Sequence, residues 1–452
     1  MFFTISAPES GYIRVSIMQT TAAVIGRVAR TGSWQRLARA AVLGCLVIAA
    51  PASAADDLQT QFDTAVTAME ADRLGTAREL LETILGSNPA MHRARLELAR
   101  VHYLDRDYSA ARAQAQQVLD DPNIPFDVRV TVLTFLAQVD ADEQQQSARH
   151  VWTPSIYLGV MYDSNVNVGP QQDVIQIGGS QFAVTGDRED GAFFINPAIS
   201  HTFNPGRRFS AGEHSGYLLW QSSASAYLRR YFDETDFNLG VLTLRTGPAW
   251  VVPRHWRASL GLQADQIWLG DGRLALFTSL NPSVNWQLGE TTELGVEGVV
   301  TRRDYNDASD SDREGWYKWA GVTLGQSYRE RTIALKAGAG YMWFDTDDNA
   351  QRFAYDGPDL FVGAAAESWE NGSVFAKVGY RKYDYQGLEP GFPNPRDEDE
   401  WRYTLGFQHS FTSGLLDEWL LIGKWEHADN DSNVPIYGYQ RDQVSLGLSR
   451  SF

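Results

Sequence analysis

Cysteine is almost absent from this chain of 452 residues, which contains only Cys45. A disulfide framework and cysteine-based zinc or iron–sulfur sites are therefore excluded. Basic residues are also scarce, because 39 Lys and Arg stand against 56 Asp and Glu and give a formal net charge of −17. Nucleic-acid binding needs clustered cations, so this balance argues against a nucleic acid as partner. No apolar run of about 18 residues follows the N-terminal segment, which excludes a helical membrane protein.

Motifs for catalysis are missing as well. The sequence contains no His-Glu-x-x-His, no Gly-x-Ser-x-Gly, no phosphate-binding loop and no cysteine pair, and its eight His are scattered. The run from Asp310 to Asp312 begins like a calcium loop, but Gly321 occupies the position that requires a bidentate Glu. We therefore expect no enzymatic activity, no cofactor and no bound metal.

The first 54 residues have the form of a secretion signal. Four Arg between positions 27 and 39 precede an apolar stretch over residues 40–50. Ala52-Ser53-Ala54 then supplies the small residues that a signal peptidase recognises. We predict a signal peptide over residues 1–54 whose removal also removes Cys45, so that the mature chain lies in or beyond the periplasm.

Residues 55–148 are predicted to form a helical domain of the tetratricopeptide type. Ala, Leu, Arg, Glu and Gln predominate, and apolar residues recur at spacings of three and four. The segments Leu74–Arg78 and Tyr108–Arg112 align at an offset of 34 residues, which is the tetratricopeptide period. We expect about two repeats and a closing helix, with a concave face that holds an extended partner or a neighbouring domain. A simple spacer is the alternative.

Residues 151–452 alternate with a period of two and contain most of the Trp and Tyr. From Trp401 to Phe411 the odd positions are mainly aromatic or apolar, whereas the even positions are polar or Gly. Such segments recur about every 20 residues, which gives about fourteen candidate strands. Wide polar connections are expected near residues 164–190, 306–313, 345–354, 386–400 and 428–436, and they alternate with tight turns. A soluble β-sandwich also alternates, but it rarely needs aromatic residues at both ends of most strands. We predict a transmembrane antiparallel β-barrel of about fourteen strands in the outer membrane, with the helical domain in the periplasm.

Two sets of residues in this region are candidates for a role. Charged residues at inward positions are expected to line the lumen, although mixed charges that only fill a wet interior are the favoured alternative. These residues are Glu297, Lys336, Lys377, Arg381 and Arg402. The amphipathic last segment ends in Phe452, a pattern that the barrel assembly machinery of the outer membrane recognises. Outer-membrane lipid and that machinery are therefore expected partners.

The run Asp163-Ser164-Asn165-Val166-Asn167 closes the first barrel segment, directly after the helical region. Together with the domain order, the strand count and the ending over residues 437–452, it resembles the surface lipoprotein assembly modifier family. The resemblance implies a fourteen-stranded outer-membrane barrel with a periplasmic repeat domain that moves lipoproteins or related secreted proteins to the cell surface. It also implies a lipoprotein or secreted protein as cargo, and a periplasmic chaperone is a further expected partner.

Two questions stay open at this level. Asp163, Asn165 and Asn167 are expected to brace the first external loop, because Asn and Asp readily hydrogen-bond turn backbones, and contact with the cargo is the alternative. An exopolysaccharide export porin and a general diffusion porin are the alternative functions of the whole chain.

Overall fold

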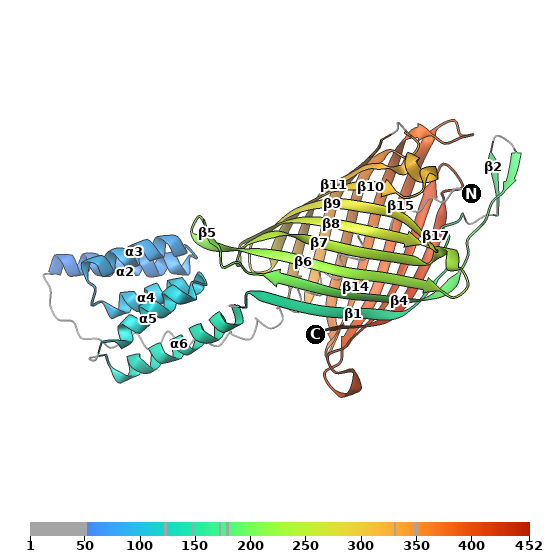
Figure 1. Cartoon of the computed structure of the whole chain (residues 1–452). Helices are drawn as coiled ribbons and strands as arrows, with labels where there is room; N and C mark the ends of the chain where they lie inside the picture. Colours follow the sequence, from blue (N-terminus) through green and yellow to red (C-terminus); the bar gives the residue numbers. More distant parts are fainter. Residues whose placement is uncertain are drawn as a thin grey trace. The chain divides into compact units, whose positions relative to one another are not determined.

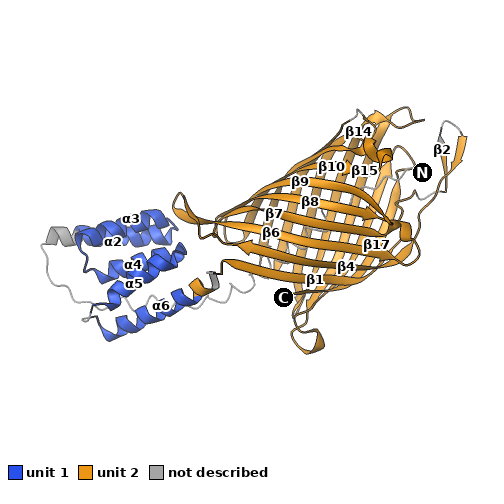
Figure 2. Ribbon diagram, in the orientation of Figure 1, with its two compact units in different colours: residues 1–141 blue, residues 142–452 orange. Residues whose placement is uncertain are grey.

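A computed structural model describes residues 52–452 except 122–123, 147, 171–172, 178–179, 330 and 348–349. The predicted signal peptide lies outside the described residues up to position 51. The chain divides into two compact units, residues 1–141 and 142–452 (Figure 2). The division falls a few residues before the predicted boundary at 148–151, inside the last helix.

Helices make up the described part of the first unit. They are α2 (Ala52–Glu70), α3 (Leu74–Ser87), α4 (His92–Leu104), α5 (Tyr108–Leu119) and α6 (Phe126–Gln146). Phe62, Leu81 and Leu98 are at most 2% exposed and belong to one core shared by α2, α3 and α4. A second core joins α4, α5 and α6 through Val118 and Val132. No described helix is long and apolar enough to span a membrane.

The two helical hairpins of this unit turn in the same way. Asp72 and Arg106 adopt left-handed backbone conformations, with φ of 59° and 57°, and occupy positions 34 residues apart. The next residue in each turn donates its N–H to a carbonyl five positions back, Arg73 to Ala68 and Asp107 to His102. This is a Schellman-type helix ending, made twice at the same offset. The offset found in the sequence therefore has a counterpart in backbone geometry.

Fourteen strands close the described part of the second unit into an antiparallel barrel (Figure 1). They are β1 (His150–Asp163), β4 (Asp190–Phe203), β6 (His214–Tyr231), β7 (Leu239–Val252), β8 (Trp256–Leu269), β9 (Gly272–Gln287), β10 (Thr292–Tyr305), β11 (Gly315–Tyr328), β12 (Ile333–Thr346), β13 (Tyr355–Trp369), β14 (Gly372–Leu388), β15 (Pro395–Ser410), β16 (Leu420–Ser432) and β17 (Tyr439–Ser451). Each strand pairs with the next, and β17 pairs with β1. The predicted barrel and its strand number are thus confirmed.

Three short strands lie outside this ring. Strands β2 (Val174–Ile177) and β3 (Ser180–Ala183) pair only with each other, in the connection between β1 and β4. Strand β5 (Arg208–Ala211) pairs with the start of β6. The β2–β3 hairpin and the β5–β6 hairpin extend from opposite ends of the barrel (Figure 1). We call the end with β2–β3 the outer end and the end with β5 the inner end.

Connections are mostly shorter at the inner end, as the sequence indicated. The turns at residues 253–255 and 370–371 lie at the inner end, whereas residues 164–189 and 306–314 connect strands at the outer end. The expectation of wide loops over 386–400 and 428–436 is wrong in extent, because β14, β15 and β16 continue through much of these ranges. An exception at the inner end is the connection over residues 411–419, which contains a short 3-10 turn.

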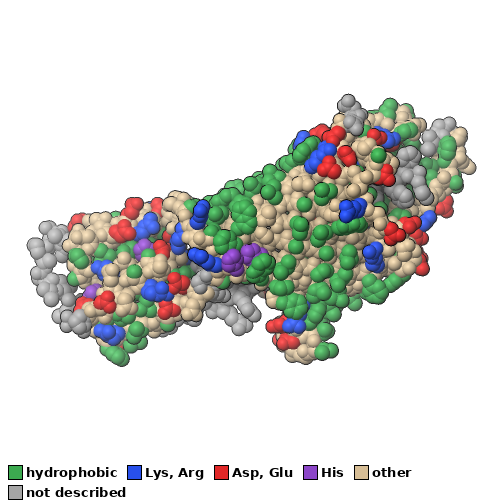
Figure 3. Space-filling view, viewed as in Figure 1, with side chains coloured by type: hydrophobic (Ala, Val, Ile, Leu, Met, Phe, Trp, Pro, Cys, Tyr) green, Lys and Arg blue, Asp and Glu red, His purple; other side chains and the backbone are tan. Residues whose placement is uncertain are grey.

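Large apolar side chains cover the outer wall of the barrel. Leu244, Val362 and Leu405 are 52%, 62% and 54% exposed. In the space-filling view, hydrophobic side chains cover the middle of the wall, and acidic and basic ones gather toward the loops of the outer end (Figure 3). A soluble protein rarely exposes apolar patches of more than a few hundred Å², so this surface is suited to lipid rather than water.

Candidate functional site

Side chains on each strand alternate between the outer wall and the lumen. On β14, Val374 and Val378 are 41% and 40% exposed on the outer wall. Lys377 lies between them and points inward, with its ammonium 4.9 Å from the ring centre of Phe361 on β13. The same alternation places every predicted lumen residue on inward positions, namely Glu297, Lys336, Lys377, Arg381 and Arg402.

Inward charges near the outer end are paired with charges that the sequence did not single out. Arg381 Nε donates to Asp359 on β13 at 3.2 Å, and the indole Nε1 of Trp319 on β11 donates to the same carboxylate at 3.1 Å. These bonds connect β11, β13 and β14 on the lumen side of the barrel. Arg381 is therefore engaged in an ion pair within the wall, and a role of the inward charges in transport stays a prediction.

A second pairing joins β15 and β17. Arg402 Nε donates to Glu400 at 2.6 Å, and the hydroxyl of Tyr439 donates to the same carboxylate at 2.7 Å. Glu400 is only 3% exposed. Its signal in the sequence is its position two residues before Arg402 on one strand, which puts both side chains on the same face.

Arginines stacked on aromatic rings line the same half of the lumen. Arg396 is 1% exposed, and its guanidinium lies 3.7 Å from the ring centres of both Tyr385 and Tyr437. Arg303 lies 4.6 Å and 4.7 Å from the ring centres of Tyr317 and Phe344. Aromatic faces attract cations, so these stacks hold the arginines against the wall. Arg396 also lies 3.5 Å from a carboxylate oxygen of Glu389 and 3.2 Å from one of Glu398.

Asp163 from the predicted family motif is fully buried at the outer end of β1. It accepts two hydrogen bonds from Arg441 on β17, at 2.9 and 2.5 Å, and one from Gln443 at 2.8 Å. The hydroxyl of Tyr231, at the end of β6, donates to the same carboxylate at 2.6 Å. One side chain therefore links the first, the third and the last strand of the barrel.

Asn165 and Asn167 hold the chain that follows β1. The Asn165 amide donates to the carbonyls of Gly169 and Gln440, both at 2.9 Å, and its oxygen accepts from the Gly169 N–H at 2.8 Å. Asn167 donates to the carbonyl of Gly186 at 2.8 Å, on the far side of the β2–β3 hairpin. Ser164 and Val166 complete the motif, with Val166 only 4% exposed and Ser164 bonded to β17.

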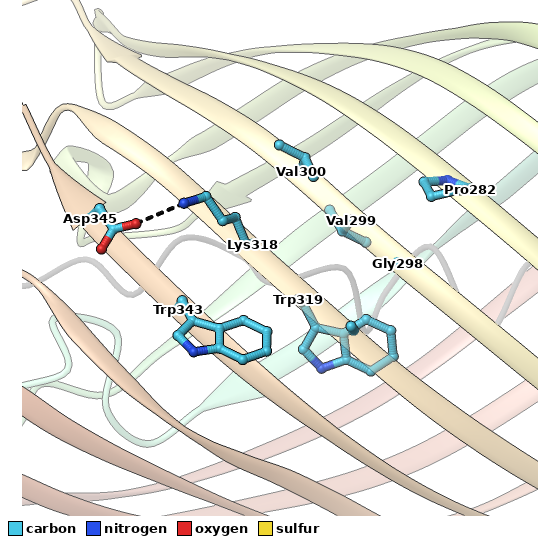
Figure 4. Close-up of a pocket in the computed structure, with 9 residues that line it drawn as sticks. Pro282, Gly298, Val299, Val300, Lys318, Trp319, Trp343 and Asp345 are labelled. Atoms are coloured by element: carbon cyan, nitrogen blue, oxygen red, sulfur yellow. Dashed lines mark hydrogen bonds and ion pairs between the residues drawn. The ribbon is translucent and has the colours of Figure 1, made fainter.

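A depression in the described outer wall contains charged groups. Its volume is about 550 Å³, and Pro282, Gly298, Val300 and Trp343 are among the residues around it. Lys318 lies beside it and donates to Asp345 at 2.9 Å (Figure 4). These residues belong to outward positions of β9 to β12, so the depression is part of the surface that faces lipid.

Aromatic residues border the apolar wall at both ends. Outward-facing Trp343 and Trp401 lie toward the outer end, and Trp152 and Trp220 lie toward the inner end; all four are at least 39% exposed. Trp and Tyr collect at the two membrane–water interfaces of transmembrane barrels. A closed barrel with a polar lumen, an apolar outer wall and two aromatic belts needs a membrane around it. The chain is a transmembrane β-barrel protein.

Comparison with known proteins gives only distant likenesses. No protein-family model and no curated protein matches the sequence. Among solved structures, OprD of Pseudomonas aeruginosa is similar with a TM-score of 0.35 and 10% identity, over 67% of this chain and 95% of that one. OpdK of the same organism, solved with vanillate, gives a TM-score of 0.35 and 12% identity, over 67% and 98%.

A third match is a loop-deleted OmpT, an outer membrane protein of Vibrio cholerae, with a TM-score of 0.36 and 8% identity over 67% of this chain and all of that one. Likenesses this distant support no inference about activity. They do not test the resemblance to the surface lipoprotein assembly modifier family, which stays a prediction.

The last predicted residue, Phe452, lies beside the inner part of β1. Its backbone N–H donates to the carbonyl of Pro154 at 2.9 Å, and its ring is 66% exposed. Arg450 lies 5.1 Å from the ring centre. Recognition of Phe452 by assembly machinery stays a prediction.

Proposed function

We propose that this protein delivers lipoproteins or related secreted proteins across the outer membrane to the cell surface. The observation that carries the proposal is the joining, in one chain, of a helical array to a barrel, with only residues 147–149 between α6 and β1. A channel for small solutes has no use for such an array, whereas a transporter of proteins needs a surface that captures an extended chain. We therefore assign the capture of cargo, or of its chaperone, to the helical unit in the periplasm.

Two observations support a repeat domain as the capturing surface. The sequence repeats at 34 residues, and the turns after α2 and α4 repeat their hydrogen bonds at that offset. Stacked helical repeats produce a concave surface, which is suited to extended partners. The short array of two hairpins and α6 limits the length of chain that it holds at one time.

Transport in this proposal needs no covalent chemistry. The inward rows of charged and polar side chains accept the peptide groups of a passing chain, which lipid could not satisfy. Folding of the cargo outside removes it from the equilibrium and makes its return unfavourable. The direction of transport then follows from the cargo and not from an energy source in the barrel.

Diffusion of solutes is the second candidate, because the polar inner wall also suits water and ions. The two functions are separated by deleting the gene and measuring two quantities. One is the surface exposure of a lipoprotein encoded beside it, by protease shaving of intact cells; the other is the uptake of small solutes. Loss of lipoprotein exposure with unchanged solute uptake supports the proposal. Unchanged exposure with altered solute flux overturns it in favour of a channel.

A further inference from the structure

The interface between β1 and β17 is the shortest in the described barrel. It contains nine residue pairs, from Ser155–Ser451 to Asp163–Gln443, and the other thirteen interfaces contain ten to fourteen. The residues of β1 before Ser155 pair with β4 but not with β17. Pro154 stands at this point and has no N–H to offer, which is typical of a strand edge.

This interface, the seam, joins the first and the last strand of the described barrel, so no turn or loop connects its two strands directly. Neighbouring strands elsewhere in the described barrel follow one another along the chain, so a turn or loop connects them when they part. β1 and β17 stand at opposite ends of the barrel sequence. They part without strain on any connecting turn.

The middle of the seam is held by backbone pairing and apolar contacts. Gly159 pairs with Gly447, and the rings of Tyr157 and Phe194 lie over them on the lumen side. A Cβ at position 159 would meet the carbonyl oxygen of Leu446 at 2.2 Å, so these strands approach closely only because both residues are glycine. Within the described residues, no side-chain hydrogen bond joins 155–162 to 444–451.

The outer end of the seam, in contrast, is held by polar groups. The Asp163 carboxylate binds Arg441 and Gln443, and Ser164 exchanges hydrogen bonds with Asp442 at 2.9 and 2.8 Å. These bonds lie at one level, next to Asp163. The seam therefore has an apolar middle without side-chain hydrogen bonds and a polar outer end that hydrogen bonds hold closed.

We propose that the seam is the exit through which the acyl chains of a lipid-modified cargo pass from the lumen into the outer leaflet. This inference rests on the proposed function. A lipoprotein carries a water-soluble body and an acyl anchor, and a charged lumen does not solvate the anchor. Because a closed barrel separates lumen from lipid, one interface has to part for the anchor to be seated. The side chains on the lipid side of the seam, such as Leu158, Val160 and Leu446, are apolar and fit acyl chains.

The test is a disulfide across the seam. Val160 and Leu446 pair directly and both face outward, with exposed fractions of 45% and 47%, so the double substitution Val160→Cys and Leu446→Cys locks the seam. Paired strand positions lie within the Cα separation of about 4.4–6.8 Å that a disulfide bridges. The matched control locks β12 to β13 with Leu335→Cys and Ala364→Cys, which are likewise paired and outward. Cys45 is the only natural cysteine and belongs to the predicted leader.

The readout is protease-accessible lipoprotein on cells that carry each variant of the full chain, with and without a reductant. We expect the seam lock to lower the surface exposure of the lipoprotein to the level of the gene deletion, and reductant to restore it. The control lock should leave this exposure unchanged. Normal export through a seam-locked barrel, or equal loss with both locks, overturns the exit route. Unaltered exposure in the gene deletion itself overturns the proposed function, so the two failures are distinguishable.

Discussion

Asp163 has no exposed surface, yet it binds groups from β6 and β17 as well as its own loop. Its substitution Asp163→Asn removes the negative charge and leaves Arg441 without its carboxylate. Loss of one partner of a buried ion pair costs about 3–5 kcal/mol, so the barrel is expected to unfold at a clearly lower temperature. The measurement is the temperature at which the detergent-resistant folded band on a gel converts to the unfolded band.

A control for this variant is Asp356→Asn on the outward side of β13. Asp356 also accepts side-chain hydrogen bonds, from Tyr341 and Gln386, but it is only half-buried and solvent reaches it at the outer end of the wall. Exposed interactions contribute about 0–1 kcal/mol, so the control is expected to unfold close to the wild type. Equal behaviour of the two variants contradicts the role of Asp163 in closing the barrel.

Individual site residues are the part of the molecule that the sequence predicts least. Asp163 is visible as part of a motif, but its partner Arg441 lies 278 residues further along. No local spacing connects the two, because only closure of the barrel brings β17 to β1. The same applies to Asp359, whose partner Trp319 is 40 residues away on another strand. The alternation along a strand predicts whether a side chain faces the lumen or the lipid. It does not predict which side chain of another strand it contacts.

At the scale of elements, helix α4 carries a half-buried titratable group, His102. Burial lowers the pKa of His102, an effect that outweighs the nearby charge of Asp107. The unfolded chain, with a His pKa of about 6.5, therefore binds this proton more readily than the folded helical unit does. The helical unit is expected to lose stability as the pH falls from neutral through about 6.5 and below.

The measurement is the urea midpoint of the helical circular dichroism signal of the full chain in detergent, taken across this pH range. His102→Gln carries no titrating ring at this position, so its midpoint is expected to fall less on acidification. The difference between the two proteins isolates His102 from the other histidines. A wild-type midpoint that rises as the pH falls would show the opposite sign and refute the assignment.

Strand β15 provides a direct test of which face meets water. Thr404 points into the lumen, and Leu405 faces the outer wall with 54% exposure. In lipid vesicles, Thr404→Cys is expected to react with a water-soluble maleimide, whereas Leu405→Cys stays unlabelled because lipid covers it. Labelling is read by mass spectrometry. Fast labelling of the Leu405 variant and none of the Thr404 variant would place the lumen on the wrong side.

The sequence predicted the parts of the strands that lipid covers. It did not predict the parts that extend beyond the lipid at the outer end. Within the membrane the outward row must be apolar, and this alternation revealed all fourteen strands. Lys382 and Asp397 also occupy outward positions of β14 and β15, but they form an ion pair at 3.1 Å toward the outer end. These strand segments are polar on both faces because they extend beyond the lipid into water, and a polar segment without alternation resembles a loop. The expected loop over 386–400 was wrong for this reason.

For the whole molecule, the sequence predicted a helical region, a β-barrel after it, and the closure of that barrel. The fold follows from periods of 3.6 and 2 along the chain, which are local properties. How the two units cooperate is not a local property, and the function has to be tested on the complete chain. The decisive variant deletes residues 57–146 and keeps the leader and the barrel.

Deletion of the helices is expected to leave the barrel intact, because all pairings that close it join residues of 150–452. The heat-dependent band shift of the variant should match that of the full chain, which shows that the barrel has assembled. Surface exposure of the lipoprotein should fall to the level of the gene deletion, since no surface remains to capture the cargo. Solute passage through the barrel should not fall. If the truncated barrel still delivers lipoprotein, the helical unit is a spacer and capture must occur inside the lumen.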